Sequence, residues 1–428
     1  MKRGHAFVLG SGIAGLSVAE ILSRNGWTIT LLESAAELGG QASRATQNWL
    51  HTGWLYAALP NKSAMLGCSE ALRLFRPIYG GVLPAGVVNV DVAGGSVSYP
   101  ASDSGWFSSE RLHYVYATAA AELSWLEGVA WRRHLRSVVF PRLRALGYNT
   151  APTSALAPDL SALLDAWEGD PNGHSKYSVV RSTDAQINTR RVLDTLLQLL
   201  GERAEVLCDV EYSVLEHAGR TSLSINGQLH TPELVILASG ASIPGQLQQL
   251  GCADVAGKFK SVCSPIVVLN RALDLPNFIR FTPKLPHTIN HVKYDVQGVG
   301  LRSTIGSYDY YPAGETPDIS PFANRVCRRL GVSTDDVAGV YYGTKTEFTG
   351  SLARRYNHAV ERVNHNTYFA IPGKFSQFPL MVQEVAARLG LLTDIANPRR
   401  GRLGLAVAPT VPEQSFATQT EAAQLGSA

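Results

Sequence analysis

The sequence predicts an α/β fold in two parts, one built on a parallel sheet and the other on a mixed or antiparallel sheet. Three observations predict it. A glycine-rich turn near the N-terminus joins a strand to a helix, and the apolar run 234–238 is typical of a central parallel strand. Residues 255–350 alternate in polarity and are rich in Tyr, Thr and Val, as antiparallel strands are. With 428 residues, the chain is long enough for two or three domains.

The composition excludes several classes of function. The 38 Lys and Arg nearly balance the 35 Asp and Glu, and the basic residues are scattered, so we expect no nucleic-acid partner. The five cysteines are far apart and form no CxxC, so we expect neither a disulfide framework nor a metal site. No apolar run reaches 18 residues and the N-terminus leads directly into a strand. We therefore expect a cytoplasmic protein without a membrane span that acts on a small molecule; its oligomeric state stays open.

A dinucleotide-binding motif opens the chain. Residues 5–10 (HAFVLG) read as a buried strand, residues 16–25 as a helix, and residues 27–33 as a second strand that ends in an acid. The turn between the first strand and the helix consists of Gly10, Ser11, Gly12, Ile13, Ala14 and Gly15. Together these elements form a complete βαβ unit of the Rossmann type.

Each glycine of this turn has a physical purpose. Gly10 permits the tight turn, Gly12 lets the backbone approach a pyrophosphate, and Gly15 lets the helix pack closely on the strand. The helix N-terminus offers free N–H groups to the phosphates. Glu33 closes the second strand, where its carboxylate can accept hydrogen bonds from an adenosine ribose.

Further elements follow along the chain. The sequence predicts helices near 63–76, 109–127, 159–167 and 188–201, strands within 80–99, and strands at 204–209, 212–217 and 221–225. Asn226-Gly227 is a hairpin turn signal. A strand at 367–370 precedes a final helix that carries Met381 and Val385 in register, and residues 401–428 show little periodicity.

Three short segments favour a flavin over a nicotinamide. The doublet Gly39-Gly40 is similar to the glycines that fold back over the FAD pyrophosphate in flavoproteins with two dinucleotide-binding domains. Ser239-Gly240 resembles the small-residue turn that such proteins place under the cofactor. Gly373-Lys374 opens a helix whose N-terminus can stabilise negative charge on a reduced flavin. An NAD-dependent dehydrogenase and a non-catalytic flavin-binding subunit of a larger complex are the alternatives.

These motifs resemble the FAD-dependent oxidoreductase family that includes D-amino acid oxidase, glycine and sarcosine oxidases, and the glycerol-3-phosphate and 2-hydroxyglutarate dehydrogenases. The resemblance is clear over the first 60 residues and looser over 188–245 and 365–390. It implies hydride transfer from a CH–NH or CH–OH bond of a small organic substrate to flavin N5. It also implies a discontinuous Rossmann-like FAD-binding domain at 1–85, 180–255 and 360–400, a substrate domain at 86–179 and 256–359, and an irregular tail at 401–428.

His51 stands out within the resemblance. The segment His51-x-Gly53-x-x-Tyr56 looks closest to the glycerol-3-phosphate dehydrogenase style, which implies that His51 lies beside the isoalloxazine. Three interpretations stay open: a base or hydrogen-bonding group at the substrate, a covalent attachment point of the flavin, or a packed histidine.

The expected site residues fall into three groups. The residues expected at FAD are Gly10, Ser11, Gly12, Ile13, Ala14, Gly15, Glu33, Ser34, Gly40, Gln41, Ala42, Ser43, Trp49, Leu50, Val210, Ser239, Gly240, Gly373, Lys374, Phe375, Ser376 and Gln377. The catalytic candidates are His51 and Lys374. The substrate candidates are Arg302, Tyr308, Tyr342 and Lys345, although tyrosines are also ordinary in antiparallel strands.

Overall fold

The computed structural model describes two long stretches of the chain. These are residues 4–152 without 61, 89, 94–95, 100–104 and 121, and residues 176–394 without 297–299, 309, 313–319 and 351–355. Residues 160, 163–164, 405 and 407 are described as well. The expected tail at 401–428 and most of the expected helix at 159–167 lie outside the described residues.

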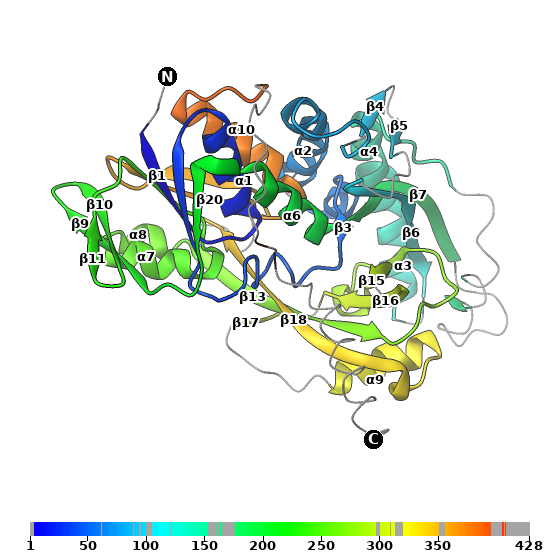
Figure 1. Cartoon of the computed structure of the whole chain (residues 1–428). Coiled ribbons are helices and arrows are strands. Elements are labelled where there is room, and N and C mark those ends of the chain that lie inside the picture. Colours follow the sequence, from blue (N-terminus) through cyan, green and yellow to red (C-terminus); the bar gives the residue numbers. More distant parts are fainter. Residues whose placement is uncertain are drawn as a thin grey trace.

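A six-stranded sheet carries the N-terminal motif (Figure 1). Its order is β19 (Ala359–Arg362), β20 (Thr367–Ile371), β12 (Leu234–Leu237), β1 (His5–Leu9), β2 (Thr28–Leu32) and β8 (Ala204–Leu207). All neighbours are parallel except β19, which pairs antiparallel to β20 at the edge. The central strand pairs with both β2 and β12, so the glycine turn leaves the middle of the sheet at its carboxyl edge.

Both faces of this sheet are covered, as its apolar strands predict. Ala6 and Val8 face a core shared with α1 (Ile13–Arg24), whereas Phe7 and Leu9 face a second core. The helices on the first side are α1, α2 (Ser63–Tyr79), α6 (Thr189–Leu199) and α10 (Phe378–Leu389). The second side carries α7 (Ile243–Gln249), α8 (Ala253–Ala256) and a three-stranded sheet of β9 (Tyr212–His217), β10 (Arg220–Ile225) and β11 (Gln228–His230).

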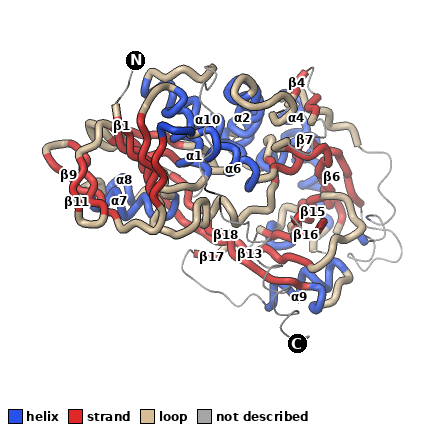
Figure 2. Tube along the Cα trace, viewed as in Figure 1, coloured by secondary structure: helices blue, strands red, loops and turns tan. Residues whose placement is uncertain are grey.

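A larger sheet forms the other half of the molecule (Figure 2). Its main path is β17 (Tyr311–Pro312), β13 (Phe259–Leu269), β16 (Gly300–Ser307), β15 (Ile289–Val296), β14 (Phe278–Phe281), β6 (Phe107–Ala119), β7 (Lys176–Ile187) and β3 (Trp49–Leu50); β18 (Val337–Phe348) also pairs with β13. Its pairings are antiparallel except that between β14 and β6, so the expectation of a mixed sheet is confirmed.

Shorter elements surround the larger sheet. They are the hairpin of β4 (Asp91–Ala93) and β5 (Ser96–Ser98), the helices α3 (Trp125–His134), α4 (Phe140–Ala145) and α9 (Ser320–Leu330), and the π-helical turn η2 (Leu135–Val139). The 3-10 turns η1 (Trp54–Ala58), η3 (Gly201–Arg203), η4 (Gly240–Ser242), η5 (Leu285–His287), η6 (Thr334–Asp336) and η7 (Phe375–Gln377) connect longer elements.

One expected helix is wrong. Residues 109–127 do not form a helix, because β6 occupies Phe107–Ala119 and α3 begins only at Trp125. Tyr114, Val115 and Tyr116 are all buried, so the strand is apolar on both faces and lacks the alternation that marks a half-exposed strand. Its partners β7 and β14 lie far along the chain, which hides the pairing from local sequence patterns.

The two sheets follow the expected division of the chain closely. The six-stranded sheet takes strands from the first, second and third segments expected for the FAD-binding domain. Three elements cross the division: β3 lies before residue 85 yet joins the larger sheet, β7 runs across residue 180, and β19 begins one residue before the boundary at 360. The boundaries themselves stay a prediction.

Candidate functional site

The glycine turn has the geometry that its sequence predicts. Gly10 has a φ of +101°, a conformation that side chains other than glycine rarely adopt. A Cβ atom at Gly15 would overlap the carbonyl oxygen of Gly10, so only glycine allows α1 to start so close to β1. Gly12 has no side chain that could cap the helix, so backbone N–H groups at this end can face an anion, although that of Ile13 is already donated to Ser43 Oγ.

A hydrogen-bond network holds the turn against the neighbouring loops. One Glu33 carboxylate oxygen accepts hydrogen bonds from the Ser11 N–H at 3.1 Å and the Ser11 hydroxyl at 2.5 Å. The same hydroxyl accepts from the Gly39 N–H at 2.9 Å, and Ser43 Oγ accepts from the Ile13 N–H at 2.9 Å. Glu33 is half-exposed, so its carboxylate supports the turn and still reaches solvent.

Two distant segments that the sequence analysis assigns to the cofactor have close backbone contacts, and the first of them lies against the glycine turn. A Cβ at Gly10 would lie 2.6 Å from the Cα of Ser239, so the turn after β12 packs directly against the glycine motif. Gly240, with a φ of +58°, opens η4 beside it. In the second segment, between β20 and η7, Gly373 has a φ of +68° and approaches the carbonyl of Asn357 so closely that a Cβ would overlap it.

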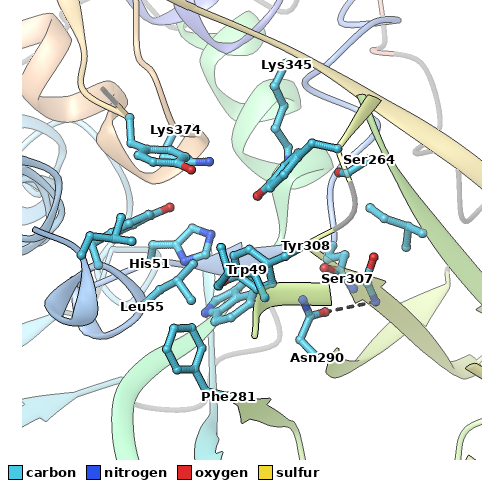
Figure 3. Close-up of a pocket in the computed structure, with 18 residues that line it drawn as sticks. Trp49, His51, Leu55, Ser264, Phe281, Asn290, Ser307, Tyr308, Lys345 and Lys374 are labelled. Carbon is cyan, nitrogen blue, oxygen red and sulfur yellow. Dashed lines mark hydrogen bonds between the residues drawn. The ribbon is translucent and has the colours of Figure 1, made fainter. Parts of the chain in front are cut away.

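A pocket lies where the glycine-bearing half meets the larger sheet, with about 740 Å³ of space that is partly open to solvent (Figure 3). It is lined by residues from 47–59, from strands and loops of the larger sheet, and from the segment before α10. Four predicted candidates converge on it, namely His51, Tyr308, Lys345 and Lys374, and the predicted cofactor residue Trp49 lines it too. Among the described lining residues no Asp or Glu occurs, so the charged side chains facing this space are cations.

His51 is held by aromatic rings and has an unused nitrogen. Its ring lies 4.5 Å from that of Trp49 and 5.5 Å from that of Tyr56, measured between centroids. Its buried Nδ1 has no hydrogen-bond partner among the described residues. Burial lowers the pKa of His51 well below its ordinary value, and the positive charges of Lys374 and Lys345 lower it further. The imidazole is therefore neutral near pH 7 and able to accept a proton or a hydrogen bond.

Lys374 enters the pocket from the N-terminal side of η7. Its ammonium lies 4.6 Å from the ring centroid of Tyr356 and 5.9 Å from that of Tyr56, distances at which a cation is attracted to an aromatic face. The neighbouring Gln377 is fully buried and bonded elsewhere. Its amide donates to the Cys68 sulfur at 3.1 Å and accepts from the His358 N–H at 3.1 Å.

The other predicted residues lie outside the pocket lining. Arg302 donates to the carbonyl of Leu301 on β16, and neither it nor Tyr342 lines the pocket. Val210 is buried next to Glu33, whose carbonyl accepts its N–H at 3.4 Å. Several of the predicted cofactor residues are exposed on the loop after β2: Ser34, Gln41 and Ala42. Leu50 is buried and lies between the lining residues Trp49 and His51 in the sequence. Ser376 is buried and Phe375 is half-buried, both shortly after Lys374. Gly40 follows Gly39 in the loop after β2.

Asp184 on β7 is a residue that the sequence analysis missed. It is fully buried, and its carboxylate accepts hydrogen bonds from the Trp49 indole at 3.0 Å, the Tyr114 hydroxyl at 2.7 Å and both the N–H (2.8 Å) and hydroxyl (2.6 Å) of Thr52. Burial raises the pKa of Asp184, and these hydrogen bonds oppose the rise. Asp184 thus fixes the residues on both sides of His51. Asp184 lies in a stretch of mixed polarity, residues 179–187 (VVRSTDAQI), so the sequence around it gave no clear signal of a buried acid.

Other lining residues also escaped the sequence analysis. They are Gln47, Leu55, Tyr56, Leu59, Ser264, Ile266, Phe281, Leu285, Asn290, Gly306, Ser307, Tyr310 and Tyr356. Tyr56 belongs to the histidine motif, so its spacing from His51 was a usable signal. The remainder come from segments more than 200 residues away, apart from the short run 47–59, and only the fold brings them together.

The residues present fit FAD. The uncapped start of α1 and the small residues around it suit a pyrophosphate, and Glu33 lies at the end of β2 where an adenosine ribose is held in this fold. In the pocket, three buried polar atoms lack a hydrogen-bond partner among the described residues: Gln47 Nε2, His51 Nδ1 and Tyr56 Oη. Orphaned polar atoms of this kind are satisfied when a polar ligand is bound.

Among the described residues no helix is long and apolar enough to cross a membrane, and no cluster of metal-ligating side chains occurs in the same part of the chain.

The comparisons with known proteins agree with this geometry. Among curated sequences none matches this chain. Solved structures with the same fold include L-alpha-glycerophosphate oxidase from Mycoplasma pneumoniae with FAD bound (TM-score 0.66, 14% identity, 95% of this chain and 100% of that one). Glycine oxidase from Geobacillus kaustophilus (0.61, 14%, 95% and 98%) and L-proline dehydrogenase from P. horikoshii (0.60, 14%, 91% and 95%) are similar too.

The family model for FAD dependent oxidoreductases, DAO, matches residues 5–370. This match covers the glycine turn, the pocket residues other than Lys374, and both sheets except the last residue of β20, and it confirms the family expected from the sequence. The chain belongs to the DAO family of FAD-dependent oxidoreductases and is an FAD-dependent oxidase or dehydrogenase.

Proposed function

We propose that this enzyme oxidises a CH–OH bond in a small organic substrate that carries a negative charge, such as a hydroxy acid or a phosphorylated alcohol. One observation carries the proposal: a neutral His51 with a free Nδ1 shares the pocket with Lys345 and Lys374, and no acid occurs among the described lining residues. Two lysines that line one pocket favour an anionic substrate.

Each lining residue has a separate role in the proposed reaction. Lys345 on β18 offers a charge-assisted hydrogen bond to the carboxylate or phosphate of the substrate. Tyr308 and Asn290 line the same wall and offer polar contacts that fix its orientation. His51 accepts the proton of the substrate hydroxyl, because its lowered pKa keeps the imidazole neutral. Lys374 places a positive charge at the flavin end of the pocket, as the sequence motif implies.

FAD, when bound, takes up the hydride from the substrate carbon at N5. The substrate thus loses one proton and one hydride, and a carbonyl forms. The same arrangement also serves a CH–NH bond, and amine oxidation is the second candidate. Glycine oxidase and L-proline dehydrogenase share the fold. Loss of a proton from an ammonium group also needs a neutral base such as His51.

Anaerobic flavin reduction by matched substrates tests the proposal. For each carbon skeleton the panel holds a 2-hydroxy acid, the corresponding amino acid and the uncharged alcohol, together with glycerol phosphate and glycerol. We expect a charged alcohol to bleach the flavin and its uncharged partner to fail at the same concentration. Reduction only by amino acids would select the second candidate, and no bleaching by any member would contradict both.

The Lys345→Met variant sharpens this test. Methionine keeps the length and apolar stem of the side chain and removes the charge. We expect the concentration of charged substrate for half-maximal bleaching to rise at least about tenfold, as loss of a charge-assisted hydrogen bond predicts. An unchanged concentration would show that the anion is held elsewhere.

A further inference from the structure

Helix α3 presents an apolar surface to solvent. Trp125 is 76% exposed, Leu126 70% and Val129 37%. Large apolar side chains of this kind are usually buried, and a contiguous exposed group indicates a contact surface. The three residues occupy the first two turns of one helix, which makes the surface continuous.

The helix is seated so that these residues cannot turn inward. Its opposite side packs on the larger sheet through Gly128, Trp131 and Leu135, all of which are buried. A Cβ at Gly128 would lie 2.8 Å from the carbonyl of Thr118 on β6, so helix and strand are in close contact. At 100° per residue, the outward residues from Trp125 to Arg133 fall within an arc of about 140°.

Positive charge continues this face toward the end of the helix. Arg133 and Arg136 are exposed, and in the described part of the chain no carboxylate lies within ion-pair distance of either. Glu127 is the acid on this helix, and its carboxylate is taken by Lys284 at 3.2 Å and by the cap residue Ser124. The face is therefore apolar at one end and basic at the other.

The helix is also linked to an element at the pocket. The ion pair between Glu127 and Lys284 joins α3 to the turn η5, whose first residue is Leu285. Leu285 is 40% exposed and lines the pocket. Figure 1 shows α3 beside β6 in the half of the molecule that holds the larger sheet.

We propose that this face, formed by Trp125, Leu126, Val129, Arg133 and Arg136, docks the enzyme on an anionic membrane surface. An exposed Trp and Leu beside arginines on one helix face are typical of helices that lie in the interface of negatively charged lipids. A symmetric antiparallel contact with a second copy would set the arginines of each copy against the apolar end of the other and leave their charges without an opposite charge, which disfavours that occupant. This inference goes beyond the proposed function and does not depend on it.

Sedimentation with vesicles tests the proposal on the full-length, FAD-loaded protein. Phosphatidylglycerol vesicles should carry the protein down at low salt, and phosphatidylcholine vesicles should carry much less. Binding should weaken as salt rises, because the arginines act through charge. Failure to bind phosphatidylglycerol, or equal binding to both lipids, would overturn the proposal.

Three variants locate the surface. Trp125→Ser with Leu126→Ser, and separately Arg133→Glu with Arg136→Glu, should each reduce the bound fraction at least about tenfold. Leu229→Ser on β11 is the matched control, because Leu229 is 62% exposed in the other half of the molecule, and it should bind as the original chain does. All variants should retain FAD and flavin reduction.

Lipid-free sedimentation equilibrium completes the test. A monomer, or an oligomer that the α3 variants leave intact, agrees with a lipid surface as the occupant. An oligomer that dissociates when Trp125 and Leu126 are replaced would show that a second copy covers this face, and would overturn the proposal.

Discussion

The two sheets of this protein build their parts of the site in different ways. The six-stranded sheet forms its ligand-binding edge from backbone: glycine conformations, an uncapped helix start and a serine-glutamate network within 35 residues. The larger sheet forms the pocket wall from side chains such as Tyr308 and Lys345, which lie far apart in sequence. Backbone geometry limits the residue types allowed at each position, whereas a pocket wall admits many combinations of side chains.

This difference predicts which property a substitution should change in each region: folding, cofactor binding or the chemical step. Changes in the backbone-built part should weaken cofactor binding, and those whose new atoms overlap backbone atoms, as at Gly15, should destabilise the fold as well. Changes in the side-chain-built part should leave the cofactor bound and alter the chemistry. The following variants test whether substitutions in the two regions have these different effects.

Gly15→Ala should have the largest effect. The new methyl group would overlap the carbonyl oxygen of Gly10, a backbone atom that cannot move without displacing β1. We expect a loss of about 3 kcal/mol or more in the free energy of unfolding, together with loss of FAD. Denaturant unfolding and the flavin absorbance of the purified protein measure the two effects.

Gly12→Ala is the matched control for this change. Its new Cβ would meet only the Ser43 hydroxyl at 3.0 Å, a side chain that can turn away. We expect nearly normal stability with greatly reduced FAD binding, since the methyl group takes space at the phosphate-facing side of the turn. A Gly15→Ala protein with full flavin occupancy would contradict the whole description of this turn.

His51→Ala should keep FAD and lose chemistry. If His51 is the base, the rate of flavin reduction should fall by about 10²–10⁴-fold. Because burial and two lysines lower the pKa of His51, the acid side of the rate profile in the original chain should lie below the ordinary value of about 6.5. Tyr56→Phe keeps the neighbouring ring and removes only its buried hydroxyl, so comparison with it separates loss of the base from loss of a polar contact to the ligand; stopped-flow reduction measures both variants.

The covalent interpretation of His51 has its own readout. Acid precipitation of the original protein should leave a colourless pellet if FAD is held without a bond. A yellow pellet that His51→Ala abolishes would instead identify His51 as the attachment point. Unchanged reduction kinetics in the variant, with freely extractable FAD, would return His51 to a packing role.

The sequence predicted the first region well because its constraints are local. Gly10, Glu33 and the hairpin at Asn226-Gly227 each follow from the conformation or contact that a few neighbours impose. The pocket wall was predicted in part: Tyr308 and Lys345 line it, whereas Arg302 and Tyr342 lie outside it. Which strand residues face the pocket depends on register and on bulges such as that between Val268 and Leu269.

The incorrect prediction of a helix at 109–127 also comes from contacts between segments that are distant in sequence. The strand β6 is recognisable only through its pairing with β7 and β14, at 176–187 and 278–281. Asp184 was missed for a related reason, because its four donors come from residues 49, 52 and 114. Long-range pairing creates both the strand and the buried acid's environment.

His291 predicts a pH-dependent stability in the larger sheet. Burial lowers its pKa from the ordinary value of about 6.5 to about 4, and both ring nitrogens are bonded, to the Pro276 carbonyl and the Ser303 hydroxyl. The unfolded chain takes up a proton below pH 6.5 while folded His291 stays neutral, so stability falls as the pH drops. The loss should reach about 3 kcal/mol at pH 4.

Comparison with His291→Gln separates the loss of stability that His291 causes at low pH from the loss caused by protonation of carboxylates. The variant lacks the titrating ring, so its free energy of unfolding should fall less between pH 6.5 and pH 4 than that of the original chain. Urea unfolding at a series of pH values measures the difference. Parallel curves for the two proteins would mean that His291 is protonated in the folded state.

Asp184→Asn should have a moderate effect on both the stability of the protein and the rate of flavin reduction. The carboxylate accepts on each oxygen, so an amide group must face either the Trp49 indole or the Thr52 N–H, both of which are donors. We expect a loss of about 1–3 kcal/mol in stability. Flavin reduction should slow because Trp49 supports the ring of His51. If the amide faces the indole, Trp49→Phe in the same chain should recover part of the stability, because it removes the opposed donor.

The smallest effect should come from Glu33→Gln. Its carboxylate joins Ser11 to the end of β2, and it is also the predicted ribose partner of FAD. We expect FAD to bind about tenfold more weakly, with an unchanged reduction rate once the enzyme is saturated. Ser11→Ala removes the hydroxyl side of this contact and keeps the Ser11 N–H, so the two variants and their combination form a double-mutant cycle for the hydroxyl–carboxylate hydrogen bond. If Glu33 acts only through the Ser11 hydroxyl, the double variant should bind FAD as either single variant does. A further loss on adding Glu33→Gln to Ser11→Ala would show that the carboxylate contacts the cofactor itself, and titration with FAD measures all four proteins.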